Sequence, residues 1–125
     1  MKKTVDYKEK HHFLSVDGAD YEIPQRTPKI EEQLKDHDAK LEDMTEYEAN
    51  MSLLNIFFGD KAAEMFPADK EINLDKLNMC VQYAKALYFA DYYAQKDEEH
   101  KEEFKRAEPY LSKANDLIRL ANEIK

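Results

Sequence analysis

Residues 74–95 read LDKLNMCVQYAKALYFADYYAQ, and this stretch decides the fold. Neither Gly nor Pro interrupts it, and it holds few charged side chains in a chain in which 37% of the residues are charged. Asn73 directly before it is a good N-cap, because its side-chain oxygen can accept from the free amides of a first helical turn. The stretch therefore predicts a long helix around which the rest of the chain packs.

Three stripes of side chains follow this predicted helix at steps of three and four residues, the spacing of one helix face. Two of them are apolar, and we expect other elements to cover both. The third begins polar and becomes aromatic at Phe89 and Tyr92, where the helix should face water. The first apolar stripe is Leu77, Val81, Ala84 and Tyr88, and the second is Met79, Tyr83, Ala86, Ala90 and Tyr93.

A β-hairpin is predicted close to the N-terminus. The pair Asp17-Gly18 tolerates the positive φ of a tight turn, and apolar residues alternate with polar ones on both sides of it. A two-stranded ribbon is marginal alone, so its apolar face must pack on helices. Residues 1–12 are polar and show no periodicity, which predicts a flexible N-terminal tail. The apolar face of the hairpin is Leu14, Val16, Tyr21 and Ile23.

Two capping signals predict two further helices before the central stretch. A helix that starts after Thr27, with proline in its first turn, has an apolar stripe that runs on to Met44. A capping box starts a second helix at Thr45, and Gly59 ends it. The apolar side of this second helix is Tyr47, Met51, Leu54 and Phe58, with Leu53, Ile56 and Phe57 beside them.

The link at residues 60–72 should be held to the core by Met65 and Phe66. After the central helix, a charge-dense stretch leads to a last amphipathic helix, and Pro109 either begins that helix or kinks a longer one. The sequence thus predicts a mainly α fold: an N-terminal β-hairpin followed by a four-helix bundle-like domain. We expect one domain, residues 13–125.

Composition and charge argue against several classes of partner and location. A chain of 125 residues suits one domain, and only two glycines and four prolines favour helices over a mostly β architecture. The net charge of -8, without a basic patch, argues against nucleic acid as a partner. No apolar run predicts a membrane span or a secretion signal, and one cysteine cannot form an internal disulfide. We expect a cytoplasmic protein.

No sequence motif predicts catalysis, a cofactor or a metal site. A glycine-rich phosphate loop, a nucleophile elbow and paired cysteines are all missing, so we expect no enzyme. Asp97 and His100 have the spacing of a carboxylate–histidine ligand pair, but a di-iron helical bundle uses two such pairs. The adjacent His11 and His12 cannot both face one ion in a regular element. Cys80 is expected to be a core residue.

The predicted functional site is an aromatic surface on the central helix. Aromatic side chains bury a large area at little cost in rotamer entropy and often anchor interfaces. Either another element of the chain covers this surface or a partner protein does, and our hypothesis is the partner. We expect Phe89→Asp to remove partner binding while the monomer stays folded. The predicted partner-binding residues are Phe89, Tyr92 and Tyr93, with Tyr88 or the pair Phe57 and Phe58 at the edge.

The run VDGADYEIPQRTP, residues 16–28, predicts a hairpin that opens into a helix begun by proline. Together with the acidic helical remainder, it resembles the small tail-assembly chaperones of tailed phages and prophages of Gram-positive bacteria. The resemblance covers residues 14–34, together with chain length and helix order. It implies a non-enzymatic protein of the host cytoplasm that coats the tape-measure protein until tail tube subunits displace it, and that is not kept in the virion. Such chaperones are sometimes extended by a translational frameshift.

Three other functions stay open on the residues alone. The chain could be a regulatory, anti-repressor-like module that binds a protein target, which a pull-down of a transcription factor would favour. It could be a metal-binding helical bundle, which metal analysis of the purified protein would decide. It could also be a structural subunit of a homo-oligomer, which light scattering across concentrations would reveal.

Overall fold

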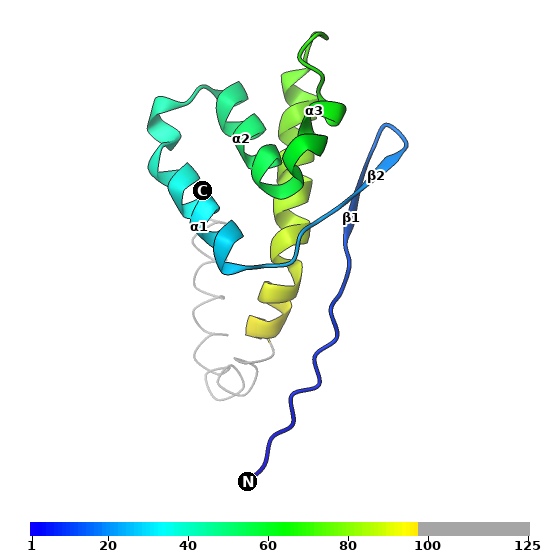
Figure 1. The fold of residues 1–125 in the computed structure, drawn as a ribbon, viewed down its shortest axis with the longest axis vertical. Helices are drawn as coiled ribbons and strands as arrows, with labels where there is room; N and C mark the ends of the chain where they lie inside the picture. The colour runs from blue at the N-terminus through cyan, green and yellow to red at the C-terminus, as the bar shows by residue number, and fades with distance from the viewer. Residues whose placement is uncertain (98–125) are drawn as a thin grey trace, which may run out of the picture. The chain divides into compact units, whose positions relative to one another are not determined.

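The hairpin and the helices follow one another in the predicted order in a computed structural model that describes residues 1–97. Figure 1 shows the hairpin, then helices α1, α2 and α3, and then a long helix at residues 74–97. Residues 1–91 form one compact unit, and residues 92–97 belong to a second. The mainly helical fold with an N-terminal hairpin is confirmed. The predicted last helix, with Pro109, lies outside the described residues.

The hairpin has the predicted turn. Strands β1 (Phe13–Val16) and β2 (Ala19–Glu22) pair antiparallel, with the first residue of β1 opposite the last of β2. Asp17 and Gly18 between them both have positive φ, at 51° and 84°, which a two-residue hairpin turn of this kind requires. The predicted apolar face is confirmed, since all four of its side chains are buried: Leu14, Val16, Tyr21 and Ile23.

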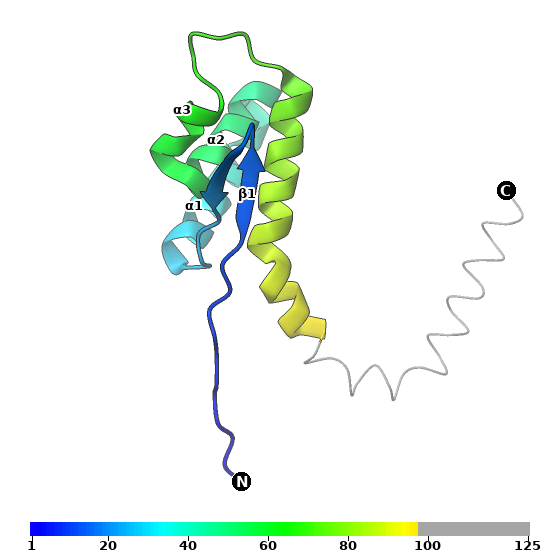
Figure 2. The same ribbon diagram turned by 90° about the vertical axis from the view of Figure 1, so that its right-hand side faces the viewer.

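The hairpin lies along the long helix and is tied to it at both ends (Figures 1 and 2). At the turn, Nζ of Lys76 lies 2.5 Å from Oδ2 of Asp17. Where the chain enters β1, Nε2 of His12 lies 3.1 Å from Oδ2 of Asp91. These two side-chain contacts join opposite ends of β1 to opposite ends of the helix, so β1 runs opposite to the helix.

Helix α1 (Pro28–Ala39) begins as predicted and ends earlier than predicted. The hydroxyl oxygen of Thr27 accepts from the amide of Ile30 at 3.3 Å, which confirms the cap. After Ala39 the amide of the next residue bonds to the carbonyl of His37, so the last turn tightens and the chain continues as a 3-10 turn, η1 (Leu41–Asp43). The predicted continuation of the helical stripe to Met44 is therefore wrong.

Helix α2 (Glu46–Phe58) contributes four buried apolar residues to the core. Thr45 caps it, accepting from the amide of Glu48 at 3.2 Å, and Gly59 ends it at a positive φ of 59°. Tyr47 in its first turn is exposed, so its predicted place on the buried side is wrong. The buried apolar residues of α2 are Leu53, Leu54, Phe57 and Phe58.

The predicted link holds two short elements, the 3-10 turn η2 (Gly59–Lys61) and the helix α3 (Ala62–Met65). Met65 and Phe66 are both buried, as the sequence predicts for an anchor of this segment. Two apolar side chains in consecutive positions thus hold the chain against the core before it reaches the long helix.

The long helix begins at the predicted cap and buries only one of its two apolar stripes. The side-chain oxygen of Asn73 accepts from the amides of Asp75 and Lys76 at 2.9 and 3.1 Å. The first stripe is buried in one core cluster with residues of the hairpin, α2 and α3. The expectation that the second stripe is also covered is wrong: Met79, Tyr83 and Tyr93 are 54%, 56% and 59% exposed. Because the hairpin, α2 and α3 gather on one side of the helix, the described part of the chain leaves the second stripe largely exposed.

Candidate functional site

A cleft of about 290 Å³ opens between α1, α2 and the long helix, within residues 1–91. Each helix contributes side chains about one turn apart, and such positions share a helix face. The cleft is therefore formed by three separate segments of the chain. Its larger apolar lining residues are Leu34, Leu41, Leu53, Phe57 and Phe89.

Two of the polar residues in the wall are fixed and buried. The Nδ1 atom of His37 lies 3.0 Å from the hydroxyl oxygen of Ser52, and the ring is buried. Asn50 is buried as well, and no buried side-chain nitrogen or oxygen in the described part of the chain lacks a hydrogen-bond partner. This part of the wall is consequently preorganised and needs no ligand to satisfy it.

The rim holds opposite charges on opposite walls. Asp38 of α1 is exposed, and Lys85 of the long helix is half-buried. Neither makes an ion pair with any residue between 1 and 97. Leu41 is 46% exposed beside Asp38, so an apolar side chain stands at the mouth of the cleft without cover. The arrangement suits contact with another molecule through apolar area flanked by charge.

Phe89 is half-buried where the cleft meets the core. Its ring packs edge-on against Tyr88, with centroids 4.8 Å apart, and Tyr88 in turn lies 5.1 Å from Phe57. A carboxylate in place of Phe89 would lie against these rings without its hydration. The expectation that Phe89→Asp leaves the monomer undisturbed is therefore replaced: we now expect this change to cost stability as well.

The structure brings together only part of the predicted partner-binding set. Phe57 and Phe89 line the cleft, and Tyr88 lies buried behind them. Phe58 is buried on another side, where its ring packs edge-on against Tyr21 of the hairpin. Tyr92 is half-buried and Tyr93 exposed, with ring centroids 5.6 Å apart, in the second unit.

Sequence reasoning missed the contribution of α1 to this site. The predicted apolar stripe that runs on to Met44 includes Leu34, His37 and Leu41, and this spacing was the available signal. Their role as one wall of a cleft depends on the distance between α1 and the long helix, which no local pattern encodes.

Burial governs the ionisation of the two titratable groups that the long helix turns toward the core. Burial, reinforced by the nearby carboxylate of Glu31, raises the pKa of Tyr88 to about 12. The Tyr88 hydroxyl donates to Oε1 of Glu31 at 3.4 Å, and Arg26 donates to the same oxygen at 2.6 Å. Burial also raises the pKa of the Cys80 thiol, although Lys76 opposes the shift. Both groups stay protonated near neutral pH and serve packing.

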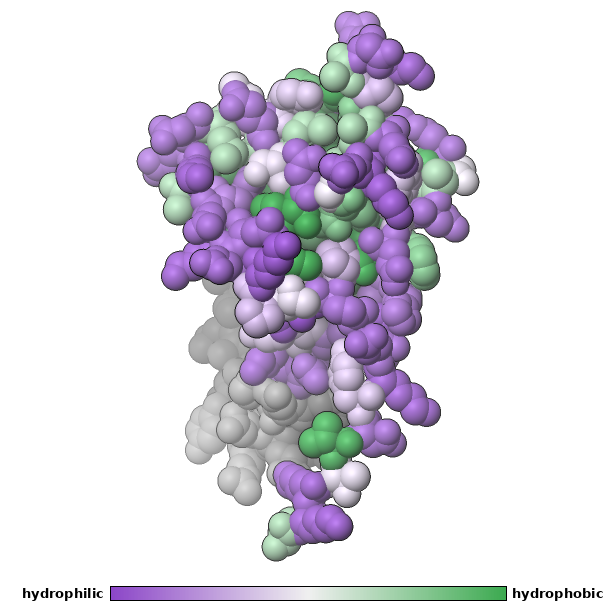
Figure 3. All heavy atoms as spheres, in the orientation of Figure 1, coloured by the Kyte–Doolittle hydropathy of each residue, from purple (hydrophilic) through white to green (hydrophobic). Residues whose placement is uncertain are grey.

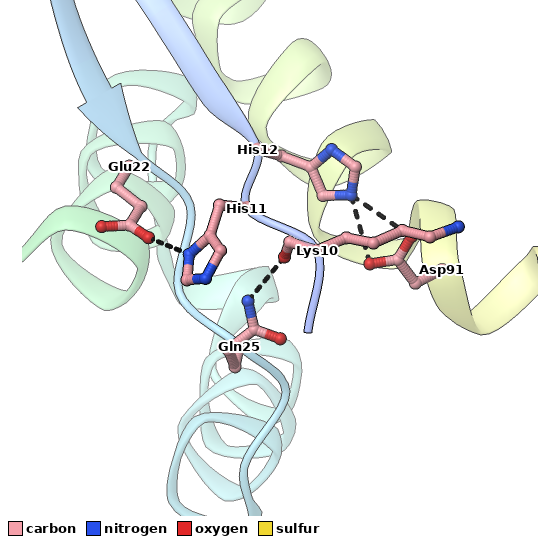
Figure 4. Close-up of polar contacts among 6 residues, drawn as sticks. All are labelled: Lys10, His11, His12, Glu22, Gln25 and Asp91. Carbon is pink, nitrogen blue, oxygen red and sulfur yellow. Dashed lines mark hydrogen bonds and ion pairs between the residues drawn. The ribbon is translucent and has the colours of Figure 1, made fainter. Parts of the chain in front are cut away.

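A second polar cluster lies at the entry to β1 (Figure 4). His11 Nδ1 lies 2.6 Å from Oε1 of Glu22, while His12 points to the long helix, and the Gln25 amide donates to the carbonyl oxygen of Lys10 at 2.8 Å. The end of the predicted tail is thus attached to the domain. Within residues 1–97 no three His, Cys, Asp or Glu side chains are placed to hold a metal ion. The pair Asp97 and His100 extends beyond the described residues.

Comparisons with protein-family models, with curated proteins and with solved structures found no match for this chain. None of the helices in the described part has the length and apolar character needed to cross a membrane.

Proposed function

We propose that the chain is a non-enzymatic protein-binding module whose cleft receives an apolar side chain from a helix of a partner protein. The observation that carries the proposal is the cleft itself, which five large apolar side chains line and at which Leu41 is exposed. Its volume of about 290 Å³ lies at the lower limit of small-molecule pockets, which run from about 300 to 1,000 Å³. A site of that size suits one large side chain that projects from a macromolecule.

The geometry of the walls supports a helical partner. Helix-in-groove recognition places the apolar face of one helix between two others, with anchors at steps of three and four residues. The cleft is bounded by α1 and α2 on one side and by the long helix on the other. The bound partner would bury Leu41, which is 46% exposed, and would contact Phe89 in the lining of the cleft.

The specific role that we propose is that of a tail-assembly chaperone in the cytoplasm of a bacterial host, shielding helices of a tape-measure protein. The support is the resemblance of residues 14–34 together with the fold, which joins a hairpin to helices in an acidic chain. A chaperone that shields a partner transiently needs apolar contact area and no catalytic residues, and the cleft provides such an area.

Co-expression with a tape-measure protein from the same gene neighbourhood tests this role. We expect the two proteins to co-purify through size exclusion, and tail tube protein to displace the chain. Separate elution at concentrations well above those in the cell would contradict the chaperone proposal.

A self-associating subunit is a second candidate, favoured by the exposed stripe on the far side of the long helix. Met79 and Tyr83 are more than half exposed and continue at helical spacing through Ala86 and Ala90. Apolar side chains at alternating steps of four and three residues are typical of helix pairing. Light scattering across a concentration series, with Tyr83→Lys as the dissociating variant, distinguishes this candidate from a monomeric binding module.

A further inference from the structure

An acidic segment of the chain borders the cleft, across from Lys85 of the long helix. Residues 36–48 contain six Asp or Glu and one Lys, whereas the whole chain has 27 acidic and 19 basic residues. This segment runs from the second half of α1 through η1 into α2, and so follows the edge of the cleft. Figure 3 shows hydrophilic side chains covering the outside of α1 and apolar ones reaching the surface in the middle of the same face.

One carboxylate of this segment lines the cleft, and three others lie close in the sequence to residues that line it. Asp38 lines the cleft, Glu42 and Asp43 follow Leu41 in the chain, and Glu46 lies one turn before Asn50 on the lining face of α2. All four are exposed, and none takes part in an ion pair inside the described part of the chain. The set, here called the acidic rim, is Asp38, Glu42, Asp43 and Glu46.

We propose that the occupant of the cleft is a basic amphipathic helix of a partner protein. One large apolar side chain of this helix fills the cleft, and Lys or Arg residues one turn to either side contact the acidic rim. The inference rests on the proposed function and names the chemistry of the partner. Charge complementarity carries it, because like charges across an interface oppose binding, while opposite charges speed and orient docking. A second copy of this chain, with its net charge of -8, lacks that complementarity.

Two synthetic peptides of equal length test the sign of the partner's charge on the full chain. Both carry Leu at alternating steps of three and four residues, and the remaining exposed positions are Lys in one and Glu in the other. We expect the basic peptide to shift the NMR signals of Leu34, Leu41 and Phe89. Its affinity should exceed that of the acidic peptide by about tenfold or more, and the difference should shrink at high salt.

Matched charge variants test whether the rim, rather than net charge, is responsible. One variant neutralises the acidic rim, and the other neutralises four exposed carboxylates outside the cleft, so both change the net charge equally. We expect the rim variant to lose the salt dependence and about tenfold in affinity for the basic peptide, and the control to keep both. The rim variant is Asp38→Asn, Glu42→Gln, Asp43→Asn and Glu46→Gln, and the control is Asp6→Asn, Glu9→Gln, Asp69→Asn and Glu71→Gln.

The outcomes separate this inference from the proposed function. Equal binding of both peptides with shifts at the cleft would overturn the basic partner and leave a protein-binding cleft. Equal losses in the rim variant and the control would also overturn it, since only net charge would then matter. Absence of binding by either peptide, together with no complex in the co-expression experiment, would overturn the proposed function as well.

Discussion

His12 and Asp91 form a hydrogen bond across 79 residues of sequence, with Nε2 of the ring 3.1 Å from Oδ2 of the carboxylate. The carbonyl of His12 also accepts from the amide of Ile23 at 2.8 Å. One residue therefore joins the start of β1, the chain leaving β2 and the long helix. The hairpin is held against the domain at this point as well as at its turn.

Asp91→Ala should loosen this attachment without unfolding the domain. The pair is about one-third exposed, so its loss should cost about 0.5–1 kcal/mol. We expect faster hydrogen exchange at the amide of Ile23, while the amide of Phe66, bonded within α3, keeps its rate. An unchanged exchange rate at Ile23 would show that the contact between His12 and Asp91 does not hold the strand in place.

Tyr88 should make stability fall at high pH. The pKa of a tyrosine in the unfolded chain is about 10, and in the folded chain that of Tyr88 is raised to about 12. Between these values the unfolded state has released the proton and the folded state still holds it, so rising pH favours unfolding. The cost is on the order of 2 kcal/mol once both forms are ionised.

The measurement is chemical denaturation of the wild-type chain and of Tyr88→Phe over this pH range. In the phenylalanine variant, the free energy of unfolding should fall less steeply with rising pH, because the phenol of Tyr88 is missing. At neutral pH the variant should be nearly as stable as wild type, because the lost hydrogen bond is long. If the free energy of unfolding changed with pH by the same amount in both proteins, the raised pKa of Tyr88 would be contradicted.

Leu77→Ala and Met79→Ala should separate the two apolar stripes of the long helix. Leu77 is fully buried, and its truncation should cost about 2–5 kcal/mol. Met79 is more than half exposed, and its truncation should change stability by no more than about 0.5 kcal/mol. Urea denaturation measures both. Comparable losses would mean that another part of the protein covers the second stripe in solution.

Gly59→Ala should destabilise the end of α2 through the backbone alone. Gly59 has φ 59° and ψ -133°, a conformation that costs a residue with a Cβ about 1–3 kcal/mol. A Cβ added there meets no other atom within 4 Å, so packing contributes nothing to the loss. Thermal unfolding checks the size of the effect, and a variant as stable as wild type would argue that the chain bends differently after Phe58.

Local signals in the sequence predicted the starts and stops of the elements. The turn at Asp17-Gly18, the caps at Thr27, Thr45 and Asn73, and the break at Gly59 each depend on one or two residues whose chemistry is the same in any context. The end of α1 at Ala39 was missed because the apolar spacing continues across it. Helix α3 was missed because four residues are too few to show a period.

The candidate site was only partly predictable, because which apolar side chains are buried by other elements depends on the whole fold. Val81 and Tyr83 both lie on apolar stripes of the long helix, and periodicity alone cannot say which stripe the other elements choose. Phe89 was found because it interrupts a polar stripe. Its neighbours across the cleft are Leu34 of α1 and Leu41 of the 3-10 turn η1, and the position of this segment relative to the long helix follows from the packing of the core.

The most direct test of the protein-binding cleft compares Leu41→Gln with Leu74→Gln. Both leucines are similarly exposed, at 46% and 44%, but Leu41 stands at the mouth of the cleft and Leu74 lies outside it. We predict that both variants fold as stably as wild type. Leu41→Gln should weaken binding of the basic amphipathic peptide about tenfold, since a central interface anchor contributes more than about 1 kcal/mol. Leu74→Gln should bind it unchanged, and equal affinities of the two variants would contradict the cleft as the binding surface.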